Sequence, residues 1–129
     1  MKKILILAVL AIMAVSASAQ KRVFCEIVGT QGLLSKKVTV TIDLGQKQSA
    51  FRWQGLVDEN GEPMKFNSMV DAMNYMGSLG WEFESAFSVG DAKSGYTYHF
   101  LLSKEVVEGE DSNEGLLTHQ QFKDAQKTE

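Results

Sequence analysis

Cysteine and proline are almost absent from this chain of 129 residues, which contains one of each. Because Cys25 is the single thiol, no disulfide can form within the chain, and the hydrophobic core must stabilise the fold without a cross-link. Paired cysteines at zinc-binding spacing are thereby excluded, and the chain has no glycine-rich phosphate loop, nucleophile elbow or helical His-Glu-x-x-His. The sequence therefore assigns no catalytic, cofactor-binding or metal-ligating residue and predicts no cofactor.

Long apolar runs are also scarce, the one clear example extending from Ile4 to Val15. This run is too short for a membrane-spanning helix. It follows two lysines and precedes Ala17-Ser18-Ala19, which completes the three-part pattern of a bacterial secretory signal peptide. We therefore expect residues 1–19 to be a signal peptide cleaved after Ala19, and the mature chain to be periplasmic or secreted with no membrane span.

Basic residues are in deficit in the expected mature chain. Without residues 1–19, 11 Lys and Arg stand against 16 Asp and Glu, a net charge of −5. Binding to nucleic acid or to anionic lipid requires clustered Lys and Arg, so the charge argues against both partners. The remaining 110 residues suit one domain with one core.

Alternation of apolar and polar residues predicts several β-strands. The clearest extends from Lys37 to Leu44, with a threonine-rich polar face. Other predicted elements are a first strand at 23–28, a loop at 29–35, a third extended segment at 51–57, and a closing antiparallel hairpin of 81–89 and 96–104. In that hairpin we expect Trp81, Phe83 and Phe87 to face the helix, together with Tyr98, Phe100 and Leu102 of the partner strand.

One helix is predicted between Ser68 and Leu79. Ser68 and Asp71 form a loose capping box, and apolar residues recur at helical spacing from Met69 to Leu79. Gly80 can adopt the left-handed conformation that ends a helix, and Trp81 then begins the next strand. These elements predict an α+β fold of two layers, in which one helix packs on one face of an antiparallel sheet of four or five strands.

The predicted domain covers residues 20–104. After residue 104 the chain is acidic and polar, so we expect residues 105–129 to form a mostly disordered tail, with a short helix from Leu116 to Ala125.

The run from Met73 to Glu84, Met-Asn-Tyr-Met-Gly-Ser-Leu-Gly-Trp-Glu-Phe-Glu, resembles the hallmark of a family of small bacterial domains of unknown function. That hallmark is Leu-Asn-x-Leu-Gly-x-x-Gly-Trp-Glu-Leu-Val. Here methionine replaces two leucines, Phe83 replaces the last leucine, and Glu84 stands where the family usually has valine. The resemblance extends through the closing hairpin, Gly95 to Lys104, and so covers about a third of the chain. It implies a helix packed on an antiparallel sheet, and it implies no activity because the family has none assigned.

The candidate chemistry lies on the closing hairpin. Glu82, Glu84 and His99 should share the sheet face turned away from the helix, with His99 opposite Ala86 and diagonal to Glu84. A carboxylate beside a histidine can form an acid/base pair or part of a metal site, but a solvated sheet face contains the same residues. We favour the structural interpretation, because no second histidine is near in the sequence and no nucleophile is suitably spaced.

Cys25 shares a predicted strand face with Val23 and Ile27. This pattern favours a small buried residue over a reactive thiol or an intermolecular disulfide, since no cationic or imidazole group flanks Cys25 to hold it as a thiolate.

Two classes of function remain. The first is a non-enzymatic binding module of the cell envelope, which acts through an exposed sheet face or edge strand by self-association or by binding an envelope protein. The second is a small hydrolase or metal-dependent enzyme that uses Glu84 and His99, which would require these two side chains to converge in a concave pocket.

The expected signal peptide predicts the first residue of the exported protein. Intact mass spectrometry of the protein recovered from the periplasm or medium should give a chain that begins at Gln20, with or without cyclisation to pyroglutamate. A product that still carries residues 1–19, recovered from the cytoplasm, would contradict the assignment.

Overall fold

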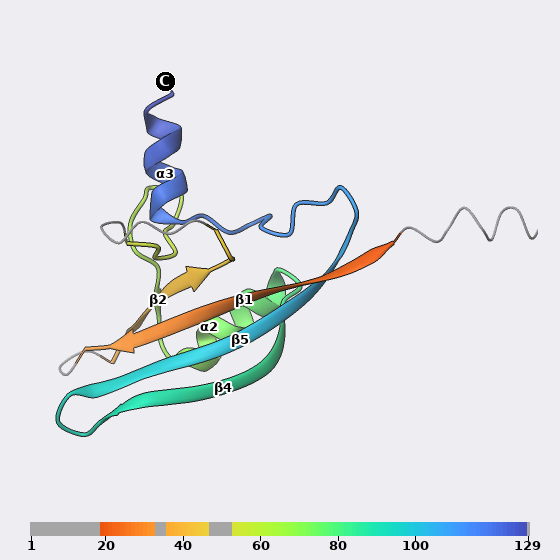
Figure 1. Ribbon diagram of the computed structural model, residues 1–129. Helices are drawn as coiled ribbons and strands as arrows, with labels where there is room; N and C mark the ends of the chain where they lie inside the picture. Colours follow the sequence, from red (N-terminus) through yellow and green to blue (C-terminus); the bar gives the residue numbers. More distant parts are fainter. Residues whose placement is uncertain (1–18, 33–35, 47–52, 129) are drawn as a thin grey trace, which may run out of the picture.

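The computed structural model describes residues 19–32, 36–46 and 53–128. Within these residues, five strands form one antiparallel sheet in the order β3-β2-β1-β5-β4, and there are two helices (Figure 1). The elements are β1 (Gln20–Gln31), β2 (Val38–Asp43), β3 (Lys65–Phe66), α2 (Met69–Ser78), β4 (Glu82–Asp91), β5 (Gly95–Val107) and α3 (His119–Gln126). The sheet-dominated architecture is compatible with the predicted α+β class.

Several predicted elements fall partly outside this description. The expected signal peptide lies outside the described residues except for Ala19, as do residues 33–35 of the expected loop, Phe51 and Arg52 of the expected third extended segment, and residue 129 of the expected tail. Residues 55–57 make isolated bridges and form no named strand. Within the described part of the chain, neither helix has the length and apolar character needed to span a membrane.

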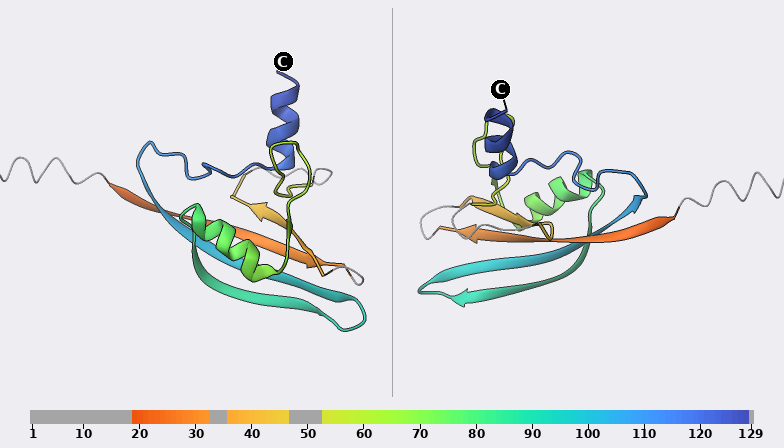
Figure 2. Two further views of the ribbon diagram at one scale, coloured as in Figure 1. Left: turned by 180° about the vertical axis from the view of Figure 1, so that it is seen from behind. Right: turned by 45° about the horizontal axis from the view of Figure 1, so that its top comes forward.

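Helix α2 confirms the predicted helix almost residue for residue. The side chain of Ser68 caps it by accepting a hydrogen bond from the amide of Asp71, and Gly80 follows it with φ of +89°. Its buried residues Met69, Ala72 and Met76 belong to the same core cluster as Trp81 and the buried side chains of the sheet. Seen from behind in Figure 2, α2 lies across β1 and β5.

Strand β1 is longer than predicted, because Gly29 lies within it and not in a loop. The reason is close packing: a Cβ atom at Gly29 would lie 2.1 Å from the sulfur of Met69. Because Gly29 has no side chain, the first turn of α2 can approach the strand closely. Gly29 therefore marks a packing contact and not a loop.

The chain after residue 104 differs from the expected disordered tail. Strand β5 continues to Val107, Leu116 is buried in the core, and the amide of Val57 donates to the carbonyl of Leu117 at 2.9 Å. The expected short helix is α3, which begins after the N-cap Thr118 and has no buried residue. The described residues thus contain two helices, each near a position where the sequence predicted one.

A β-bulge in the closing hairpin corrects the predicted faces of β4. Phe83 is paired with Leu102 as expected, but the register shifts between Phe83 and Ser85, so that Phe87 is paired with His99 and not with a core-facing residue. Phe87 is consequently 60% exposed. The prediction that Phe87 faces the helix is wrong, because a bulge adds one residue and exchanges the two faces of the strand beyond it.

The packing of Trp81 gives a stability prediction. Trp81 is 3% exposed, so Trp81→Ala should lower the free energy of unfolding by about 3 to 5 kcal/mol in urea titrations. Trp81→Phe is the matched control: it keeps an aromatic ring and removes the Nε1 donor, which has no hydrogen-bond partner among the described residues. The control should cost clearly less. An unfolding midpoint scarcely moved by Trp81→Ala would contradict the packing.

Candidate functional site

The candidate site is the sheet face that points away from α2, which we call the open face. In Figure 1 the strands lie in front of α2, so the viewer looks onto this face. Successive side chains of a strand point to opposite sides, so residues that alternate with the buried core lie here. The register aligns Thr41, Val28, His99 and Phe87 in one row across β2, β1, β5 and β4.

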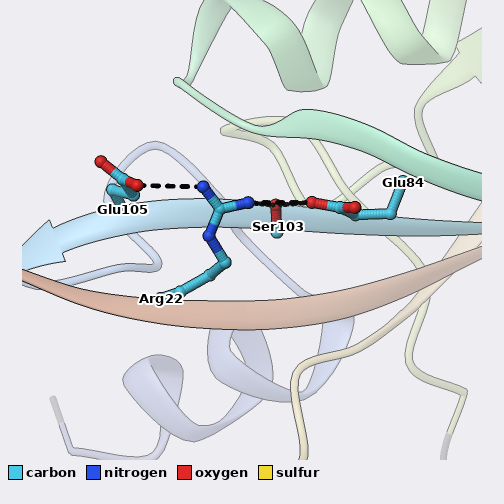
Figure 3. A network of polar contacts seen from close by, with 4 residues as sticks. All are labelled: Arg22, Glu84, Ser103 and Glu105. Carbon is cyan, nitrogen blue, oxygen red and sulfur yellow. Dashed lines mark hydrogen bonds and ion pairs between the residues drawn. The ribbon is translucent and has the colours of Figure 1, made fainter.

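A polar network occupies one end of the open face (Figure 3). The guanidinium group of Arg22 donates to Glu84 Oε1 at 3.1 Å, to Ser103 Oγ at 3.2 Å and to Glu105 Oε1 at 2.9 Å. Ser103 also donates to Glu84. The hydrogen bond with Glu105 raises the pKa of Arg22, so the guanidinium stays charged. This network joins β1, β5 and the bulge of β4, and it gives the bulged Glu84 a fixed partner.

His99 lies further along β5 and has different partners. Its Nδ1 atom contacts the carboxylate of Glu26 on β1, and its ring stacks on Phe87 with centroids 4.5 Å apart and an interplanar angle of 4°. Both neighbours come from adjacent strands, so the imidazole is held on two sides. The alternation of β1 places Glu26 on the open face, and the bulge brings Phe87 there.

The structure does not bring Glu84 and His99 together. The predicted register placed His99 opposite Ala86, whereas it is paired with Phe87. Glu84 bonds to Ser103, which lies four residues along β5 from His99. At a rise of roughly 3.3 Å per residue, the backbone positions of Ser103 and His99 are about 13 Å apart, and Glu84 and His99 have separate hydrogen-bond partners. Ser103 and His99 are therefore too far apart to act as nucleophile and base.

Clustered metal ligands are also missing from the described residues, where no three His, Cys, Asp or Glu side chains could hold an ion. Three surface grooves formed by described residues, of about 440, 370 and 320 Å³, are lined by residues other than those of the polar network and His99. Among the described residues, the open face presents mutually paired polar groups that line none of these three grooves.

Exposed apolar side chains cross the open face obliquely. Phe24 on β1, Leu101 on β5, and Phe87 and Val89 on β4 are 54%, 39%, 60% and 58% exposed. Each is a diagonal or same-strand neighbour of the next, because Phe24 is paired with Ser103, Leu101 with Ser85 and Phe87 with His99. We call these four residues the apolar stripe. It leads from the middle of the sheet to the strand at its edge.

Sequence reasoning missed most of this face. Arg22, Phe24 and Glu26 could have been found, since they alternate with Val23, Cys25 and Ile27 along β1. Ser103 could have been placed by the same rule on β5. The position of Phe87 depends on the bulge, for which the sequence carried no clear signal.

Comparison of the chain with protein-family models, with curated proteins and with solved structures gave no significant match. The resemblance of residues 73–84 to the bacterial family of unknown function remains an inference from that run alone, and the site is interpreted from its own geometry.

Cys25 lies on the opposite, core-facing side of β1 and is 3% exposed. Its burial raises the pKa of the thiol to about 12, from an ordinary value of 9.0. A buried thiol with this pKa is a poor nucleophile, as the pattern of the strand predicted.

Thiol labelling measures this burial directly. At pH 8 the folded protein should react with a thiol reagent about a thousandfold more slowly than the urea-unfolded protein, because the thiolate fraction falls tenfold for each unit of pKa. The unfolded chain is the internal control, since it contains the same single cysteine. Equal rates in the two states would show that Cys25 is accessible.

Proposed function

We propose that this chain is a non-enzymatic binding module of the cell envelope, which acts through its open face by self-association or by binding another envelope protein. The observation that carries the proposal is the apolar stripe, in which three of the four side chains are more than half exposed. Contiguous exposed apolar patches rimmed by polar residues mark interaction sites in soluble proteins.

The surroundings of the stripe support binding over catalysis. Ser103 and Glu84 bond to each other and to Arg22, and His99 is held between Glu26 and Phe87. Groups with fixed partners of this kind form the polar rim of an interface, where they set orientation and register.

The alternative enzyme, a hydrolase or metal-dependent enzyme using Glu84 and His99, requires convergence of these two side chains. Their separate partners on the sheet argue against it, since Glu84 bonds to Ser103 and His99 contacts Glu26. The expected export and the net negative charge of the mature chain fit an envelope protein partner better than a nucleic acid or an anionic membrane.

Substitution within the stripe tests the proposal. The mature chain should self-associate in sedimentation experiments or retain an envelope protein in affinity capture, and Phe24→Lys with Phe87→Lys should weaken that interaction about tenfold or more. Val70→Lys is the matched control, because Val70 is 67% exposed on α2, away from the open face. A strictly monomeric chain that retains no partner would refute the proposal, as would binding that the double variant leaves unchanged.

A further inference from the structure

The two edges of the sheet differ in how they are covered. On one side, β3 is paired with Val38 and Thr39 of β2, and the amide of Leu56 donates to the carbonyl of Val40 at 3.0 Å. On the other side, β4 is the last strand, and no described strand is paired with its outer edge. All ten residues of β4 are exposed. The outer backbone groups of β4 therefore form a row that another strand can pair with.

Strand β4 has few of the features that normally prevent edge pairing. Natural edge strands are usually short, or carry lysine, proline or a bulge along their length. The six residues Ser85-Ala86-Phe87-Ser88-Val89-Gly90 contain neither a charged residue nor a proline. The one bulge lies before them, at Glu84. This segment is long enough to pair, and it contains two residues that favour extended structure, Phe87 and Val89.

We propose that β4 pairs antiparallel with β4 of a second copy of this chain, joining two five-stranded sheets around a two-fold axis. The proposal rests on the proposed function of the open face and names its partner. Charge weakly favours this direction. Glu82 and Glu84 lie at the start of β4, while Asp91 at its end and Lys93 just beyond it carry opposite charges that balance. In-register parallel pairing would place each carboxylate beside its own copy, whereas antiparallel pairing brings the two glutamates toward an end with no net charge.

The side chains fit one antiparallel register in particular. Pairing that keeps the open faces of both copies on the same side can place Ser88 opposite Ser88 of the second copy. Phe87 of each copy then lies opposite Val89 of the other, so the two-fold axis generates two equivalent pairs. The apolar stripes of the two copies meet there. On the other side of the sheet, Ala86 lies opposite Gly90, and both are small enough to avoid a clash.

The opposite edge of the sheet limits growth beyond two copies. Among the described residues it offers only the two-residue strand β3 and the bridged segment around Leu56, so a third chain finds no long described strand to pair with there. A two-fold contact between identical edges is closed, so it produces a dimer and not a fibre.

A charge exchange at Ser88 tests the pairing. Sedimentation velocity of the mature wild-type chain should show a concentration-dependent dimer. Ser88→Lys and Ser88→Glu should each weaken it about tenfold or more, because like charges then face each other across the axis. An equimolar mixture of the two variants should restore association at least to the wild-type level. Val70→Lys and Val70→Glu, on the exposed side of α2, should change nothing.

If a charge at Ser88 disturbs folding, cross-linking of the neutral variant Ser88→Cys tests the same pairing. Oxidation of Ser88→Cys should give a covalent dimer, since residues opposite each other in an antiparallel pair lie within disulfide range. Cys25 is buried and contributes no cross-link, so Val70→Cys is the matched control, which should form no covalent dimer.

Three results would overturn the pairing: a wild-type chain that stays monomeric at every concentration, a mixture no better associated than its two components, or Ser88→Cys that forms no dimer. The proposed function fails separately. Suppose that the wild-type chain is monomeric but captures an envelope protein, and that Phe24→Lys with Phe87→Lys abolishes this capture. That result would refute β4 pairing and support the binding module. A monomeric chain that captures no partner would refute both proposals.

Discussion

Close packing between α2 and the buried side chains of the sheet is the interaction on which this structure depends. The chain has no disulfide, so the core formed by Met69, Met76 and Trp81 with residues of β1, β2 and β5 must hold the fold together. The packing is tight where Met69 lies on the bare backbone of Gly29. Strands β1, β2 and β5 therefore present their buried apolar residues to the side of α2, and the alternate residues of these strands lie on the open face.

The open face follows from this constraint, but its chemistry follows from pairing between strands. Arg22 is 62 residues away from Glu84 in the sequence, and Glu26 is 73 residues away from His99, yet each pair is in contact on the sheet. These contacts join the polar groups of the open face to one another. Beside them the four side chains of the apolar stripe are exposed.

The bulge at Glu84 connects the fold to the proposed interaction. It turns Glu84 toward Ser103 and Arg22, and it moves Phe87 and Val89 to the open face. Without the extra residue, Phe87 would face the side of the helix and the stripe would end at Leu101. The same strand lies at the uncovered edge of the sheet, so an exposed backbone and exposed apolar side chains occur together.

The sequence by itself determined the elements whose signals are local. The Ser68 cap, the apolar spacing to Leu79 and the left-handed Gly80 specify α2, and the alternation of β1 correctly predicted that Cys25 is buried. Tertiary structure decided the rest. The bulge depends on how β4 meets β5, the role of Gly29 depends on where α2 docks, and the order after residue 104 depends on Leu116 entering the core and Leu117 bonding to Val57. Caps and periodicity act within a few residues, whereas register, edge exposure and docking are set by the free energy of contacts between segments far apart in the chain, which no local pattern encodes.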